Sequence, residues 1–408
     1  MNKIRMLLQE GWRSVFSLSL ILVIATITFH GCATTMPGHT FEQRTKGLYV
    51  SGTELYNKKN YIQAAYLLRQ AIEFNPQFAE AYYVLGLSYL KLKDYDAALE
   101  NFNKAAELKP ITEKPGYDEA DIEFNIGLTY IGRKEYDKAE ASLHKAIEMR
   151  QNFAEAYYNL AYIAQQRGDK NTAFQNLQQA IAKDSTMDKA YVALGSLYRE
   201  EGKLDQAQQQ YERAIKLNRE NKQAYNELGK LYRDRGELQT AIRFLRKATQ
   251  IDDKYVEAYM NLGLVYVDMK SYKQALDNFQ KATRIDSTLP EGYMNLAQVH
   301  YLMSDTTAAL ANYRKVLKLD PKRKLVNFQI GLILDQLGRT KEAIAAYRRE
   351  IELNPDHAPS HLNLAILLHR GGQLEDALLH YKRFVELAPD DRRAQKVRAI
   401  LRRLEKLN

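Results

Sequence analysis

A pattern of small and aromatic residues recurs every 34 residues along most of the chain. The unit at 256–289 shows its two sets of apolar or small residues: Tyr259, Leu262, Gly263 and Tyr266, then Ala275, Phe279 and Ala282. Steps of one, three and four residues place each set on one face of an α-helix. Since two short helices cannot bury both apolar faces by themselves, each unit requires stacked neighbours of the same kind.

The same register extends in both directions from this unit. A shift of 34 residues carries Gly263 to Gly229, and one longer step places a seven-residue insertion at 111–117. A glycine between the two sets, such as Gly236, is expected to end the first helix in the left-handed conformation. The register predicts ten units, at residues 45–78, 79–112, 120–153, 154–187, 188–221, 222–255, 256–289, 290–323, 324–357 and 358–391.

Prolines close several of these units: Pro76, Pro110, Pro321, Pro355 and Pro389. With the order of small and aromatic positions, this pattern resembles the tetratricopeptide repeat family. Tyrosines such as Tyr225 and Tyr259 stand where that family has a tryptophan near the start of the first helix. The resemblance implies an all-α fold, a right-handed superhelical solenoid of about ten helical hairpins. It also implies protein binding rather than catalysis, and a fold of this kind does not identify the partner.

The first 31 residues have the features of an export signal. Basic residues precede an uncharged run from Val15 to Phe29, which is shorter than the roughly 20 residues of a membrane-spanning helix. Cys32, the only cysteine, follows this run and Gly31. The arrangement resembles a bacterial lipoprotein signal, which implies cleavage before Cys32 and attachment of lipid to it. An uncleaved membrane anchor and a secreted protein are the alternatives.

The resemblance to lipoproteins implies a location in the cell envelope. Residues 32–44 are predicted to be a polar tether. Ala33 stands where an aspartate retains many such proteins at the inner membrane, so we expect the outer membrane, with the repeats facing the periplasm. At the other end, residues 392–408 combine a dense basic charge with an apolar helical face at Val397, Ile400, Leu401 and Leu404. They predict a capping helix, with contact to anionic lipid or polysaccharide as the sharper alternative.

In the tetratricopeptide repeat family the first helix of each unit lines a concave groove. Positions 2, 5, 6, 9, 12 and 13 of each unit are then expected to face inward. The apolar residues predicted there are Tyr83, Leu87, Phe124, Leu128, Tyr158, Tyr162, Met260, Leu264, Met294, Phe328 and Leu332. The basic residues predicted between them are Lys189, Arg199, Lys230 and Arg233. The groove is therefore predicted to be apolar, then basic, then apolar, and exposed apolar patches mark contact sites.

An asparagine recurs at position 6 of several units: Asn125, Asn159, Asn261, Asn295 and Asn363. Its amide offers two donors and an acceptor, which suits hydrogen bonding to the main chain of an extended peptide. The row is interrupted at Ala193 and Glu227. We therefore expect peptide or protein segments in the groove, bound at several separate places.

Other function classes find little support. The formal charge of +9 would suit nucleic acid, but the export signal argues against it. His357 and His361 lie one turn apart without the glutamate of a zinc motif, so a solvated helix face is expected and neither a metal nor a cofactor. We expect a non-catalytic scaffold for an envelope machine: pilus or secretion assembly, polysaccharide export, or cell-wall synthesis. The alternatives are a recruiting subunit for a separate enzyme, and a polysaccharide anchor that uses the four basic residues of the groove.

Overall fold

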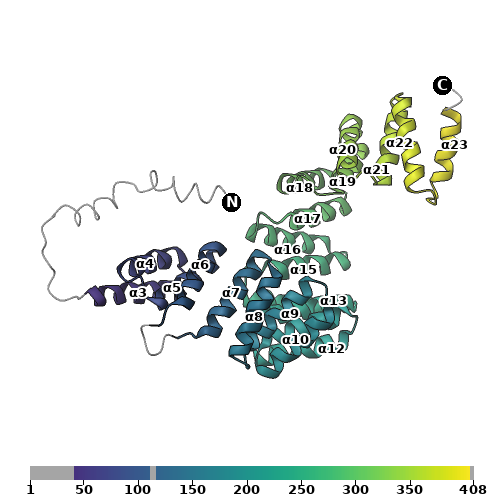
Figure 1. Ribbon diagram of the computed structural model, residues 1–408. Helices are drawn as coiled ribbons and strands as arrows, with labels where there is room; N and C mark the ends of the chain where they lie inside the picture. The colour runs from purple at the N-terminus through teal and green to yellow at the C-terminus, as the bar shows by residue number, and fades with distance from the viewer. Residues whose placement is uncertain (1–40, 111–115, 405–408) are drawn as a thin grey trace, which may run out of the picture. The chain divides into compact units, whose positions relative to one another are not determined.

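The computed structural model describes residues 41–110 and 116–404, whose regular structure is entirely α-helical (Figure 1). The helices are α3 (Phe41–Asn57), α4 (Tyr61–Phe74), α5 (Ala79–Leu92), α6 (Tyr95–Glu107), α7 (Glu119–Arg133), α8 (Tyr136–Met149), α9 (Ala154–Gln166), α10 (Lys170–Lys183), α11 (Asp188–Glu200), α12 (Leu204–Leu217), α13 (Lys222–Asp234), α14 (Leu238–Ile251), α15 (Val256–Asp268), α16 (Tyr272–Ile285), α17 (Pro290–Leu302), α18 (Thr306–Leu319), α19 (Val326–Gln336), α20 (Thr340–Leu353), α21 (Ala358–Arg370), α22 (Leu374–Leu387) and α23 (Ala394–Leu404).

Consecutive helices pack as hairpins, from α3 with α4 to α21 with α22, and α23 packs on α22. The predicted all-α solenoid of helical hairpins is confirmed. We call the first helix of each hairpin the A helix and the second the B helix. The chain divides into two units, residues 1–151 and 152–408. Within each unit, A helices of successive hairpins also touch: α3 with α5, α5 with α7, α11 with α13, and α13 with α15.

The small and aromatic positions of the repeat meet inside each hairpin. A Cβ atom on Gly263 of α15 would lie 2.4 Å from the ring of Phe279 on α16, so only glycine permits this approach. Phe279 is fully buried. The turn that follows the A helix takes the left-handed conformation, as predicted, with φ of 79° at Gly236. In the next hairpin Lys270 occupies that conformation instead, with φ of 58°.

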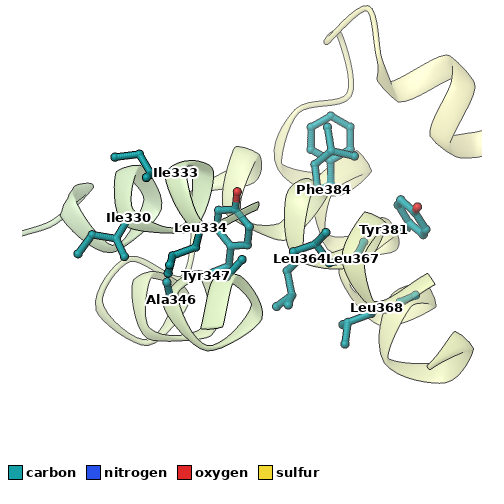
Figure 2. Close-up of a cluster of buried hydrophobic side chains, with 14 of the residues drawn as sticks. Ile330, Ile333, Leu334, Ala346, Tyr347, Leu364, Leu367, Leu368, Tyr381 and Phe384 are labelled. Carbon is teal, nitrogen blue, oxygen red and sulfur yellow. The ribbon is translucent and has the colours of Figure 1, made fainter. Parts of the chain in front are cut away.

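The core is built from these contacts repeated along each unit. Leu68, Phe102 and Leu143 are fully buried in unit 1. In the C-terminal part of unit 2, Figure 2 shows Ile330, Leu334 and Tyr347 on one hairpin and Leu364, Tyr381 and Phe384 on the next. The apolar face of α23 is buried in the same cluster through Ala394, Val397, Leu401 and Leu404, with Ile400 packed against it.

Two local features differ from the expected boundaries. Residues 41–44, expected in the tether, form the first turn of α3, where Glu42 favours the positive end of the helix dipole. In the hairpin of α19 and α20 the A helix begins only at Val326, because Leu325 is left-handed with φ of 70°. Its N–H donates to Oε1 of Glu350, a fully buried carboxylate, at 2.7 Å.

The predicted export signal and Cys32 lie outside the described residues, as do residues 111–115 of the insertion. Between Phe41 and Leu404, leaving out that insertion segment, no helix is both long enough and apolar enough to cross a bilayer.

Candidate functional site

In unit 1 the A helices use two of the predicted groove residues for internal contacts. Tyr83 stacks on Tyr117 with ring centroids 4.0 Å apart. The Nδ2 atom of Asn125 donates to the Tyr83 hydroxyl at 3.1 Å and to the Asp121 carbonyl at 2.7 Å. Burial raises the pKa of Tyr83, which keeps its phenol neutral. Both amide hydrogens of Asn125 are therefore already used, which leaves only its carbonyl oxygen for a peptide. The other residues predicted here, Leu87, Phe124 and Leu128, are half-buried.

The first two A helices of unit 2 leave more side chain accessible. Tyr162 on α9 is 40% exposed. Lys189 places its Nζ atom 5.0 Å from the ring centroid of Tyr158, which attracts the cation to the aromatic face. Asn159 donates to the Glu155 carbonyl one turn earlier in its own helix at 2.7 Å. Tyr158 and Tyr162 therefore present an aromatic edge, while one amide hydrogen of Asn159 is bound locally.

The predicted basic section of the groove is a row of ion pairs. Arg199 donates to Asp234 at 2.9 Å, and Arg233 donates to Asp268 at 2.5 Å, each 35 residues further along the chain. The contact between successive A helices places position 12 of one unit beside position 13 of the next. The prediction of a free basic surface at Arg199, Lys230 and Arg233 is wrong, because it counted the cations without their carboxylate partners.

Glu227 on α13 is the centre of this network and is only 8% exposed. Its carboxylate accepts from Lys230 Nζ at 2.8 Å and from Asn226 Nδ2 at 3.3 Å, and it lies 3.9 Å from Arg199. Asn261 on α15 then donates to Asn226 Oδ1 at 2.9 Å. A buried carboxylate needs such partners, so Glu227 serves the packing of α11, α13 and α15.

A cavity of about 760 Å³ opens beside this network, and we call it the A-side cavity. It is formed by α13, α15, the start of α17 and the loops that precede α15 and α17. Its lining residues are Lys222, Gln223, Asn226, Glu227, Lys230, Asp252, Lys254, Tyr255, Val256, Glu257, Met260, Asn261, Asp286, Leu289 and Glu291. Three of the predicted groove residues, Lys230, Met260 and Asn261, meet here.

Local structure explains the loops of the A-side cavity. Asp252 and Asp286 each follow a B helix and accept the N–H of the residue two positions later, at 2.9 Å in both cases. This turn is typical of aspartate and directs the chain into the next A helix. Hydrogen bonds from Lys222 to Asp252 and from the Thr288 hydroxyl to Asp286 hold the pKa of each carboxyl below its usual value.

The cavity is acidic rather than basic. Its lining includes five carboxylates and three lysines. Lys222 is paired with Asp252, and Lys230 with Glu227. Apolar atoms of Val256, Met260 and Leu289 complete the wall. Sequence reasoning missed Glu227, Glu257 and Glu291, although an acidic residue recurs at position 2 or 6 of these units.

The remaining predicted residues lie further along unit 2 and do not join this cavity. Leu264, Met294, Phe328 and Leu332 are half-buried and pack against the hydrophobic clusters between helices. Asn363 donates to the Tyr347 hydroxyl at 3.4 Å, and Asn295 is half-buried. The second apolar section is therefore partly core, which explains why these positions are apolar without requiring a ligand.

The expectation of a solvated face for His361 is wrong. It is 5% exposed, its Nδ1 lies 2.9 Å from Nδ1 of His380, and its Nε2 donates to the Pro355 carbonyl at 2.9 Å. Burial lowers the pKa of both histidines. In the part of the chain with described coordinates, no group of three or more potential ligands is placed to hold a metal ion.

Solved structures with a similar arrangement are repeat proteins. YrrB, described as a tetratricopeptide repeat protein with an unusual peptide-binding site, is 26% identical over 46% of this chain and 97% of its own, with a TM-score of 0.41. PilF of Pseudomonas aeruginosa is 21% identical over 60% of this chain and 96% of its own, with a TM-score of 0.43. Yeast Tom70 is 16% identical over 90% and 97%, with a TM-score of 0.45. No curated protein matches the sequence.

Family profiles match along most of the chain. Those described as tetratricopeptide repeat match residues 77–152, 144–175, 192–256, 294–358 and 328–392. One described as TPR repeat matches residues 52–93 and 265–304. With the stacked hairpins and their glycine–aromatic contacts, these matches establish that the chain belongs to the tetratricopeptide repeat family.

Proposed function

We propose that this protein is a non-catalytic scaffold that binds an extended segment of a partner protein in the A-side cavity. Repeats of this family suggest protein–protein interaction. The observation that supports the cavity itself is its lining: apolar side chains beside amides and carboxylates, in a volume within the range of ligand sites. Asn261 keeps its own carbonyl oxygen and one amide hydrogen for main-chain groups, since only one of its hydrogens goes to Asn226.

We place this scaffold in the cell envelope, on the evidence of the sequence alone. Cys32 directly after an apolar run supports a lipid anchor, and residues 33–40 then lead to α3. Such a protein would hold together a pilus, secretion, polysaccharide-export or cell-wall assembly. Metabolic labelling with a fatty-acid analogue should mark the full-length protein and not its Cys32→Ser variant. Equal labelling of both would exclude lipidation at this cysteine.

The groove assignment is tested by photo-crosslinking in intact cells. A crosslinking amino acid at Met260 should capture a discrete partner, whereas the same amino acid at exposed Gln280 on α16 serves as the matched control. The variant Met260→Glu should lose the partner in a pull-down with an unchanged helical circular dichroism spectrum. The same partner captured from position 280, or recovered with Met260→Glu at normal yield, would refute binding in the A-side cavity.

A recruiting role for a separate envelope enzyme is distinguished by the identity of the captured protein. In that case the partner is an enzyme, and its activity changes when the complex forms. The polysaccharide anchor on Arg199, Lys230 and Arg233 is disfavoured, because each of these cations is already paired with a carboxylate.

A further inference from the structure

Three consecutive B helices in unit 2 carry an unusual excess of positive charge. Helices α14, α16 and α18 together contain nine basic residues and one acidic residue, Asp277. We call these basic residues the B-face strip: Arg243, Arg246, Lys247, Lys273, Lys281, Arg284, Arg314, Lys315 and Lys318. All of them except Lys315 are exposed.

The B-face strip is hardly neutralised by the protein itself. Among the residues with described coordinates, only Arg314 has a carboxylate partner, Glu342 at 3.6 Å. Lys281 and Lys315 lie over the rings of Tyr259 and Tyr293, at 5.6 and 5.5 Å from the centroids, which leaves their charge uncompensated. The strip therefore projects a positive potential that favours an anionic ligand.

A pocket of about 590 Å³ lies at one end of the strip, between α13 and α14, and we call it the B-side pocket. Its lining residues are Tyr225, Gln239, Ile242, Arg243, Phe244, Arg246, Lys247 and Gln250. It holds three cations, two primary amides and two aromatic rings, and no carboxylate. Arg246 is oriented by a hydrogen bond from its Nη2 atom to the Tyr266 hydroxyl at 2.9 Å.

The pocket is the place where a repeated contact is missing. In three neighbouring hairpins a B-helix cation covers the tyrosine at position 4 of the A helix: Arg213 over Tyr191, Lys281 over Tyr259, and Lys315 over Tyr293. Tyr225 is the equivalent residue of its hairpin, and Lys247 is the equivalent cation. In this part of the described chain no cation covers Tyr225, and both residues line the pocket. The ring and the amine are thus both available.

We propose that the B-side pocket binds a carboxylate-bearing sugar of a linear acidic polysaccharide, and that the B-face strip binds the units that follow. Arginine and lysine suit the carboxylates, and Gln239 and Gln250 offer donors and acceptors for hydroxyl groups. The Tyr225 ring supplies an apolar surface for the sugar ring. A bilayer would instead take exposed apolar side chains between the cations, and in these three helices Ile285 is the only large hydrophobic residue exposed. This site does not depend on the A-side cavity.

Isothermal titration calorimetry of the full-length protein with oligogalacturonate tests the proposal. The double variant Arg243→Glu/Lys247→Glu should bind about tenfold more weakly. The matched control Arg402→Glu/Arg403→Glu changes the net charge equally on exposed positions of α23 and should bind as the unaltered protein does. Tyr225→Leu should weaken oligogalacturonate binding, with circular dichroism and thermal unfolding used to show that the hairpin is intact.

Three competing ligands decide the class of polyanion. Poly-L-glutamate of equal length, double-stranded DNA and vesicles with anionic phosphatidylglycerol should each bind more weakly than oligogalacturonate and should not respond to Tyr225→Leu. If any of them binds as tightly and responds in the same way, the assignment to a sugar acid is wrong. Equal weakening by the control variant would show that net charge, and not the B-side pocket, accounts for binding.

Discussion

The A helices and the B helices of unit 2 use the same charged residues in opposite ways. On the A side, Arg199, Arg233 and Lys230 each meet a carboxylate, and Glu227 is buried among them. On the B-face strip, nine cations share one intramolecular carboxylate partner. A count of basic residues would rank both faces as anion-binding surfaces. The comparison shows that a charge is available to a ligand only where neighbouring helices do not already neutralise it.

This difference follows from how the helices meet. A helices of successive hairpins touch, so a cation on one can reach a carboxylate on the next. The exposed cations on the B helices have few neighbours of opposite charge within reach. Paired charges contribute to packing and resist competition by a ligand, whereas unpaired ones repel one another and attract counter-ions. The A side is thus suited to apolar and hydrogen-bonding contacts, and the B side to electrostatic ones.

The largest effect is expected from loosening the hairpin that contributes to both faces. Phe279→Ala removes a fully buried ring that fills the space against Gly263, and should lower the free energy of unfolding by about 3–5 kcal/mol. Urea unfolding followed by circular dichroism measures this. The exposed neighbour Gln280→Ala should change it by less than about 0.5 kcal/mol. Equal stability of the two variants would mean that this contact does not hold α15 and α16 together.

The buried carboxylate on the A side should be the most sensitive charge in unit 2. Glu227→Gln leaves Lys230 and Arg199 without their shared counter-charge and should destabilise the protein by about 2 kcal/mol. Glu212→Gln, at an exposed position on α12, is the control and should have little effect. High salt should not restore the loss, because the site is largely shielded from solvent. A neutral effect of Glu227→Gln would remove the basis for contrasting the two faces.

A titrating pair should produce a pH dependence that neither face shows. Burial lowers the pKa of His361 and His380 in the folded protein, so below about pH 6.5 the unfolded chain binds more protons than the folded one. Stability should therefore rise with pH through this window and fall on acidification. Thermal unfolding at pH 5 and pH 7.5 should differ less in His361→Leu/His380→Leu than in the unaltered protein. An unchanged difference would contradict this, and His144→Gln on an exposed site of α8 is the control.

The smallest effect compares one cation from each face directly. Arg233→Gln breaks a half-exposed ion pair with Asp268 and should cost about 0.5–1 kcal/mol. Arg284→Gln removes an unpaired cation from the B-face strip, and should leave stability unchanged or raise it slightly at low salt. Thermal unfolding at low and high ionic strength distinguishes the two. The reverse order of effects would show that the neutralisation of the A side is not a stabilising arrangement.

The 34-residue period by itself determined the helical hairpins, their stacking and the family. It did so because spacing within a helix decides which residues share a face, and Gly263 opposite Phe279 specifies how closely two helices approach. These are local relations, which a single sequence records directly. They also predicted that Met260, Asn261 and Lys230 belong to one wall, and these three residues do line one cavity.

Only the tertiary structure decided which polar side chains are free. Asn125 and Tyr83 satisfy each other, and Arg199 meets Asp234. By contrast, Lys247 leaves Tyr225 uncovered where its equivalents cover theirs. The partner of each group belongs to another helix, and a difference of a few ångströms in the packing of two helices determines whether the pair forms. Composition and periodicity contain the charges but not these distances, so the functional surfaces emerge only once the helices are stacked.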